Sequence, residues 1–223
     1  MRDIDGIKNL VEGRKDLATT LLERAFVAED KEIFVMLLEM GANPDKVSIH
    51  TKWGPEPLFM PVAGHDDSFW TEQILKHGAN PNQQYTANRI YPLTFAIERH
   101  KPNNVRLLIE HGADVNSRDQ DCSQIDLSWS QWQHEITYDL LTHGADVNAP
   151  AQLLKSMIGQ MRFDFRDKAD SRVISRAKEL GTFDYLEKIL AWFDEHNLDW
   201  RNATHSDPTG KTPGVWSIPK LNP

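Results

Sequence analysis

One short phrase recurs along this chain and constrains its fold more than any other feature. It reads LLIEHGADVN at residues 107–116 and LLTHGADVN at residues 140–148. The apolar residues predict the buried stripe of a helix, and glycine is the residue that most often ends a helix in a left-handed conformation. The Asp and Asn that follow can bond their own backbone and shape a tight turn. The phrase therefore predicts a helix end followed by a chain reversal.

The phrase occurs twice more, as LLEMGANPD ending at Asp45 and ILKHGANPN ending at Asn82. A second landmark lies 21 or 22 residues before the glycine of each copy. Two landmarks at a fixed offset indicate one repeated unit of two helices with a glycine stop. The glycines, which are 37, 34 and 32 residues apart, are Gly41, Gly78, Gly112 and Gly144. The second landmarks are TLLERAF (20–26), EPLFMPVA (56–63), YPLTFAI (91–97) and SQIDLSW (123–129).

The unit resembles the ankyrin repeat, whose period is about 33 residues and whose motif is T-P-L-H-x-A. The resemblance covers residues 15–148. It implies an all-α fold, an ankyrin-repeat α-solenoid with about four recognisable repeats. The opening threonine of the motif is replaced by Glu56, Tyr91 and Ser123 in units two to four. We therefore expect less regular stacking than in a consensus array.

The flanking segments complete the expected organisation. Residues 1–14 carry the helical pattern IDGIKNLV, with Ile4, Ile7, Leu10 and Val11 as its stripe, and are expected to cap the open end of the stack. Residues 201–223 contain four prolines and no period, so we expect an extended tail.

The segment between the repeats and the tail, residues 149–200, is also expected to be helical. PAQLLKSMIGQM (150–161) and KADSRVISRAKELG (168–181) predict a degenerate fifth repeat that ends at Gly181. TFDYLEKILAWFDEHN (182–197) has an apolar stripe at helical spacing and predicts a C-terminal capping helix.

Charge and cysteine content narrow the class of partner and the compartment. The net charge of −8 argues against a nucleic-acid partner, which requires a basic face. A single cysteine, Cys122, points to a reducing compartment. No apolar run approaches the roughly 20 residues that span a bilayer, and the charged N-terminal segment is unlike a secretory signal. We expect a monomer in the cytoplasm, with the nucleus as the alternative, that binds no membrane.

The sequence contains no glycine-rich phosphate loop, no H-E-x-x-H and no G-x-S-x-G motif. We therefore expect no catalytic residues, no cofactor and no metal ion. His77, His111 and His143 each precede a repeat glycine, which is a helix-end position.

Two clusters leave alternatives open. In GHDDSFW (64–70), His65 and the two aspartates after it suit a metal or acid–base site, but equally cap the link between two helices. Trp129 and Trp132 are expected in the first helix of unit four, where the ankyrin pattern has small residues. They either pack against the segment RFDFRD (162–167) or the tail, or form an aromatic anchor for a partner.

The resemblance implies protein recognition. Turns and first helices of successive repeats line a concave surface, and the side chains on this surface are not needed to form the core. The alternative is an enzyme or small-ligand binder on the same solenoid, with a pocket near Trp129 and Trp132 or near His65. An enzyme predicts a closed pocket with converging polar groups, whereas an interaction module predicts an open groove. The expected partner contacts are Trp53, Pro55, Asn88, Ile90 and Gln120 from the turns, and Glu98, Arg99, Ser130 and Gln131 from the first helices.

Overall fold

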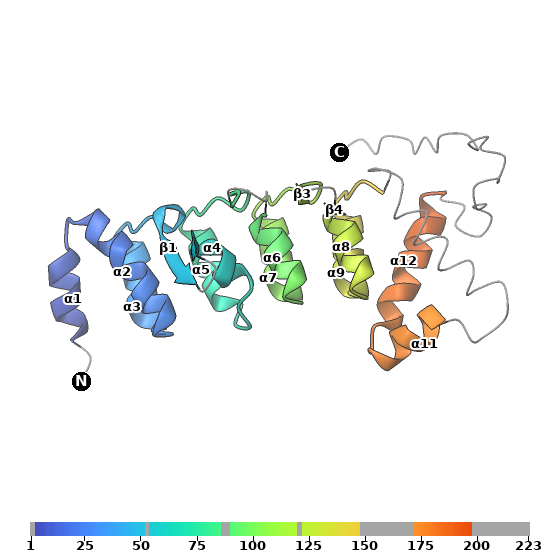
Figure 1. Ribbon diagram of the computed structural model, residues 1–223, viewed down its shortest axis with the longest axis horizontal. Coiled ribbons are helices and arrows are strands. Elements are labelled where there is room, and N and C mark those ends of the chain that lie inside the picture. Colours follow the sequence, from blue (N-terminus) through green and yellow to red (C-terminus); the bar gives the residue numbers. More distant parts are fainter. Residues whose placement is uncertain (1–2, 52–53, 86–89, 120–121, 148–171, 198–223) are drawn as a thin grey trace. The chain divides into compact units, whose positions relative to one another are not determined.

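The computed structural model is mostly helical and describes residues 3–51, 54–85, 90–119, 122–147 and 172–197 (Figure 1). The chain divides into two compact units, residues 1–121 and residues 122–223. No described helix combines the length and the apolar character that a bilayer span requires.

The first unit is built from pairs of antiparallel helices in two layers. Helices α2 and α3 pack together, as do α4 and α5, and α6 and α7. The first helices α4 and α6 contact each other, and so do the second helices α5 and α7. The helices, blue to green in Figure 1, are α1 (Ile4–Val11), α2 (Lys15–Val27), α3 (Lys31–Glu39), α4 (Phe59–Ala63), α5 (Phe69–Lys76), α6 (Pro92–Glu98) and α7 (Pro102–Glu110).

Short strands connect the helix pairs, where the sequence predicted helices and turns alone. Strand β1 (Ser48–Thr51) pairs antiparallel with β2 (Gly54–Pro57), after a 3-10 turn η1 (Pro44–Lys46). A single bridge joins Tyr85 to Ile90, and β3 (Arg118–Asp119) is the last strand of this unit. The mostly helical structure agrees with the expected fold class, and the short strands in the connectors are an addition to it, because these connectors are long enough to fold back on themselves as hairpins.

The recurring glycines end the second helices as predicted. Each has a left-handed φ, and the alanine after it donates its N–H to the carbonyl five residues earlier, at 2.8–3.0 Å. This arrangement satisfies carbonyls that a helix end otherwise leaves without a donor. The alanines are buried, so a larger side chain would not fit under the turn. The φ angles are +89° at Gly41, +83° at Gly78, +86° at Gly112 and +85° at Gly144.

The first helices end with the same geometry but without glycine. Glu29, His100 and Trp132 have φ of +51°, +57° and +62°, and the residue after each bonds back across the helix end at 2.9–3.0 Å. The prediction that Trp132 lies in the first helix of unit four is therefore wrong. The ankyrin pattern has a small residue at the position of Trp132 because the backbone there is left-handed, and only glycine adopts that conformation without strain.

The core of the first unit is aromatic at its N-terminal side. Trp70 of α5 is buried, and its ring packs edge-on against Phe26 and Phe34 at centroid distances of 5.4 and 5.0 Å. Helix α1 has the predicted position, but its stripe is only partly buried: Val11 is covered, whereas Leu10 is 51 % exposed. Ile4 and Ile7 are half-buried, so the neighbouring residues cover only part of this stripe.

The second unit contains β4 (Cys122–Ser123), α8 (Gln124–Ser130), α9 (His134–Thr142), α11 (Arg172–Glu179) and α12 (Phe183–Glu195). Helix α8 begins with a reciprocal capping box between Ser123 and Asp126 and packs on α9, which also contacts α12. Helices α11 and α12 lie within the predicted ranges 168–181 and 182–197. The predicted helix at 150–161 and the predicted tail lie outside the described residues.

Candidate functional site

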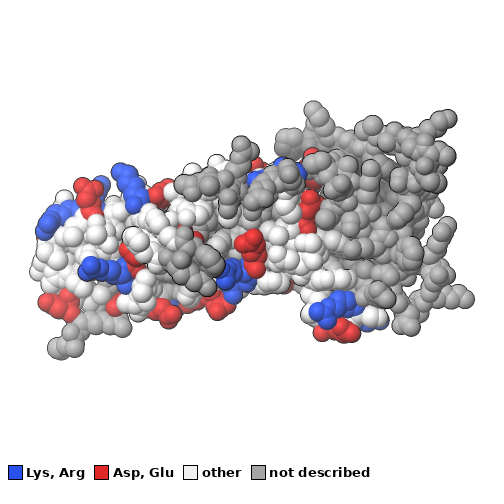
Figure 2. Space-filling view, viewed as in Figure 1, with Lys and Arg blue, Asp and Glu red and all other residues white. Residues whose placement is uncertain are grey.

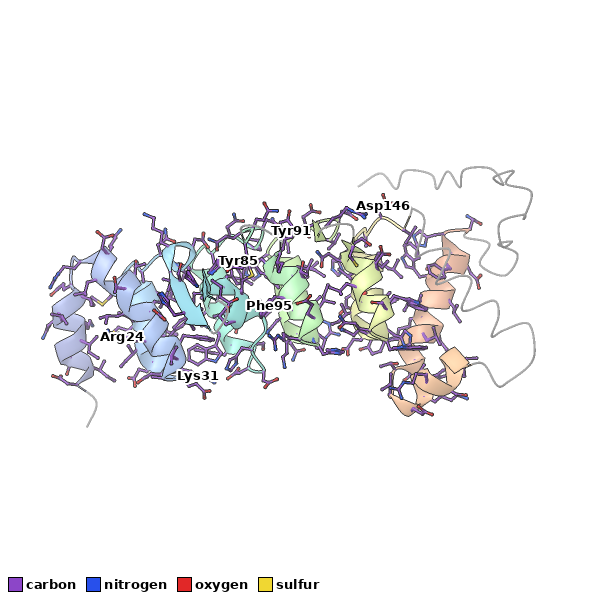
Figure 3. The ribbon with its side chains drawn as sticks, viewed as in Figure 1. Arg24, Lys31, Tyr85, Tyr91, Phe95 and Asp146 are labelled. Carbon is purple, nitrogen blue, oxygen red and sulfur yellow. The ribbon has the colours of Figure 1, made fainter. Side chains whose placement is uncertain are left out.

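Partly exposed side chains gather at α6, the first helix of the α6–α7 pair. Tyr91 is the N-cap of α6, Phe95 lies within the helix, and Arg99 is its C-cap. Phe95 and Arg99 are four residues apart and share one side of the helix, where they contact each other. Together with Pro55 and Tyr85 from the preceding hairpins, these three residues form what we call the aromatic face. Its three rings are half-buried, and Pro55 and Arg99 are exposed. Figure 3 shows Tyr85 and Tyr91 near the loop end of α6 and Phe95 further along the helix.

Backbone and side-chain hydrogen bonds hold the hairpin part of the aromatic face in place. The Tyr85 N–H donates to the Ile90 carbonyl at 2.8 Å, which closes the loop before α6. The Tyr85 hydroxyl donates to the Pro55 carbonyl at 2.9 Å and so ties this loop to the β1–β2 hairpin. The Gln84 amide donates to the Tyr91 hydroxyl at 3.3 Å. These bonds restrict the tyrosines, so less freedom remains to be lost when a ligand binds.

Phe95 lies directly over the end of α4. A Cβ atom added to Gly64 would stand 2.9 Å from Phe95 Cδ1, closer than real contacts allow. Glycine at this position therefore lets the ring approach the neighbouring backbone. The Arg99 guanidinium lies over the same ring, with Cζ 5.0 Å from the ring centroid, and this cation–π contact orients the charge.

The turns that follow successive helix pairs of the first unit are linked to each other. The Asn80 N–H donates to both Asp45 carboxylate oxygens at 3.1 Å, and the Asp114 N–H donates to Asn82 Oδ1 at 2.8 Å. Asn82 also donates to the Gly112 carbonyl at 2.9 Å. The polar residues after the glycines therefore bond both their own turn and the next one. This ladder fixes the spacing of the hairpins that carry the aromatic face.

The structure places the sequence-predicted contact residues in several locations. Pro55 and Arg99 belong to the aromatic face, and Ile90 and Glu98 lie beside it on the same loop and helix. Ser130 ends α8 in the second unit, and Gln131 follows it as the cap. The predicted contacts Trp53, Asn88 and Gln120 lie outside the described residues.

Tyr85, Tyr91 and Phe95 were missed as site residues by sequence reasoning. The four-residue spacing from Phe95 to Arg99 was a usable signal, because it places two large side chains on one side of a short helix. Tyr85 gave no signal of its own, since its position depends on the bridge to Ile90. On the described part of the surface seen in Figure 2, acidic and basic side chains are interspersed with uncharged ones.

The cluster around His65 holds the link between α4 and α5. His65 Nδ1 accepts a hydrogen bond from the Asp67 N–H at 3.0 Å, and the ring packs against Phe26 and Trp70. Asp67 accepts a hydrogen bond from the Phe69 N–H at 3.0 Å and forms an ion pair with Lys31. Both contacts lower the pKa of the Asp67 carboxyl, and the hydrogen bond from Lys31 is the larger cause. A hydrogen bond from Lys101 likewise lowers the pKa of Asp66. These contacts are structural. Among the described residues, no group of three or more His, Cys, Asp or Glu side chains is placed to hold a metal ion.

Two tryptophans of the second unit, Trp129 and Trp132, lie beside a buried histidine. Trp129 is only 6 % exposed, and its ring lies 5.2 Å from that of His134, while the half-buried Trp132 lies 6.1 Å away. His134 is fully buried, its Nδ1 lies 2.8 Å from the Thr182 hydroxyl, and burial lowers its pKa to about 4. Its Nε2 has no hydrogen-bond partner among the described residues. Trp129 therefore contributes chiefly to the packing of this unit.

The histidines before the repeat glycines occupy helix ends as predicted. Nδ1 of His77, His111 and His143 lies 2.7–2.9 Å from the backbone carbonyl four residues earlier. Each ring therefore bonds a carbonyl in the last turn of its own helix, which accounts for the recurrence of the residue type.

Comparison with known proteins agrees with this geometry. A family model described as Ankyrin repeat matches residues 88–120, which include α6, α7 and the turn after Gly112. Over 79 residues, the chain is 40 % identical to ankyrin repeat and SOCS box protein 6 of Homo sapiens, 39 % to that of Pongo abelii and 38 % to that of Mus musculus. The match covers 34 % of this chain and 19 % of each relative, so it spans about a fifth of their length.

Proposed function

Because this chain contains an ankyrin repeat, we propose that it is a non-catalytic protein-interaction module that binds its partner on the aromatic face. The observation that carries the proposal is the half-buried rings of Tyr91, the N-cap of α6, and Phe95 within this helix, together with Tyr85 and Pro55 on the hairpins before it. Tyr and Arg are enriched among residues whose truncation weakens protein complexes most. The face joins three such side chains, Tyr85, Tyr91 and Arg99, to one phenylalanine.

The physical basis of binding is burial of surface that folding leaves exposed. A partner that covers the rings removes apolar area from water at roughly 25 cal/mol per Å². Arg99 presents a planar group that can bond a carboxylate of the partner, while its stem stays on Phe95. The hydrogen bonds of Tyr85 and Gln84 reduce the ordering cost of association.

The proposal extends to the architecture around the face. Residues 15–148 form about four ankyrin repeats of a solenoid, residues 1–14 cap it, and residues 149–200 supply a degenerate repeat and a capping helix. The helix pairs with the same glycine turn support this division. The partner is a protein, bound by a monomer of this chain in the cytoplasm, and the inner-helix contacts include Glu98 as well as Arg99.

An enzyme built on the same helices has weaker support. The His65 cluster, which was one of its two predicted locations, is engaged in capping α5 and pairing with lysines. The groove that Trp132 lines together with Ser175, Arg176 and Glu179 of α11 is open to solvent. Both observations favour the interaction module over a catalytic pocket.

The double substitution Glu98→Ala/Arg99→Ala should weaken partner binding about tenfold or more. It removes the Arg99 guanidinium, which the contact with the Phe95 ring holds in position to bond the partner. Affinity capture from native extract with mass spectrometry first identifies the partner, and isothermal titration then gives its Kd. The control Asn103→Ala/Glu110→Ala changes exposed residues of the second helix α7 and should leave the Kd unchanged. Unchanged affinity in the first variant, with the melting temperature of both variants retained, would contradict the proposal.

A further inference from the structure

A groove separate from the aromatic face lies on the second-helix side of the first unit. Helix α3 forms its floor, and α1 and α5 form its walls, because both helices contact α3. The groove has a volume of about 570 Å³. Its apolar lining is half-buried and consists of Ile4, Val35, Met36 and Phe69. These four side chains are the apolar surface that an occupant of the groove would cover.

The rim of this groove is predominantly acidic. Asp5, Glu32 and Glu39 line it, together with Lys8 and Lys31. The Lys31 ammonium is already compensated, since its Nζ lies 2.5 Å from Asp67 Oδ2 and 4.8 Å from the centre of the Phe69 ring. Three carboxylates therefore stand against one remaining ammonium, that of Lys8. An occupant that brings positive charge to the rim gains electrostatic attraction, and an acidic one is repelled.

The walls of the groove also restrict the form of the occupant. Its three helices satisfy their own backbone hydrogen bonds and offer no strand edge to an extended peptide. An extended segment would leave backbone groups without partners over the apolar floor. A helix satisfies its own backbone groups and can place an apolar stripe on Val35 and Met36, where the flexible Met36 adapts to its shape. A second copy of this chain is disfavoured, because both copies carry a net charge of −8.

We propose that the groove between α1, α3 and α5 binds a basic amphipathic helix of a partner protein, with its apolar stripe on Val35 and Met36 and its Lys or Arg side chains against Glu32 and Glu39. The site is independent of the aromatic face, because the two share no residue. The chain would then have two binding surfaces, one on each helix layer of the first unit.

The test uses the full chain and two synthetic helical peptides with the same leucine stripe, one flanked by lysines and the other by glutamates. Fluorescence anisotropy of labelled peptide should give a Kd for the lysine peptide that is about tenfold lower or more, with weakening at high salt. The variant Glu32→Lys/Glu39→Lys should lose most of this preference. Amide hydrogen exchange should show protection by the lysine peptide in α1, α3 and α5.

Two controls separate this groove from general attraction of a basic peptide to an acidic protein. The variant Glu110→Lys/Glu187→Lys changes the net charge equally at exposed positions that do not line the groove, and it should keep the preference. Equal loss in both double variants, or protection confined to other helices, would overturn the proposal. So would self-association in sedimentation velocity that Glu32→Lys/Glu39→Lys abolishes, because the occupant would then be a second copy. Circular dichroism and melting curves confirm that each variant is folded.

Discussion

Replacing Trp70 with alanine should lower the free energy of unfolding by about 3–5 kcal/mol. The ring is 1 % exposed and packs edge-on against Phe26 and Phe34, so truncation removes buried apolar area and leaves a cavity. The surrounding residues come from α2, α3 and α5, and they cannot all move into the space without losing other contacts. Urea-induced unfolding followed by circular dichroism measures the change.

The neighbouring aromatic residue provides the matched control for this substitution. Phe69 is only half-buried and belongs to the apolar lining of the groove between α1, α3 and α5, so Phe69→Ala should cost clearly less free energy of unfolding than Trp70→Ala. Equal losses in the two variants, or a loss under about 1 kcal/mol for Trp70→Ala, would mean that the aromatic core is placed wrongly.

Acidification from pH 7 to pH 4 should destabilise the chain by about 3 kcal/mol through His134 alone. Burial lowers the pKa of His134 from 6.5 to about 4 in the folded state. Between these values the unfolded chain holds a proton that the folded chain lacks, so unfolding takes up a proton. The contribution of neutral His134 to the free energy of unfolding is therefore fully present above pH 6.5, and it is lost as the pH falls from 6.5 to 4.

The contribution of His134 can be isolated by measuring unfolding free energies at several pH values in that window. The variant His134→Gln cannot titrate and should show a much flatter pH dependence, whatever its absolute stability. His111→Gln changes an exposed histidine at a helix end and should retain the slope of the parent chain. If His134→Gln kept that slope as well, the buried neutral histidine would not be its source.

The local geometry of the repeats could be predicted from the sequence because it depends on neighbouring residues. A glycine that follows an apolar helical stripe ends the helix with positive φ, and Gly112 at +86° does so. The polar residues after it shape the turn, as Asp114 does by accepting the Asn116 N–H at 2.9 Å. Each of these features depends on a few consecutive residues, so the same short pattern recurs in the sequence wherever the feature occurs.

The candidate site could be predicted only in part, because it depends on contacts between distant segments. Pro55 and Arg99 follow from their slots in the repeat, whereas Tyr85 joins them through a hydrogen bond to a residue 30 positions away. The buried environment of His134 depends in the same way on Thr182 of the last described helix pair. The sequence wrongly predicts a helical Trp132, because a bulky residue gives no sign that its backbone is left-handed.

Site-specific photo-cross-linking tests most directly whether the aromatic face binds a protein. A benzophenone amino acid replaces Tyr91 in one variant and Glu110 of α7 in another, and each is irradiated in native extract. The interaction module predicts one discrete cross-linked species from position 91, which disappears when Glu98→Ala/Arg99→Ala is added. A discrete species from position 110 with none from position 91 would contradict binding on the aromatic face.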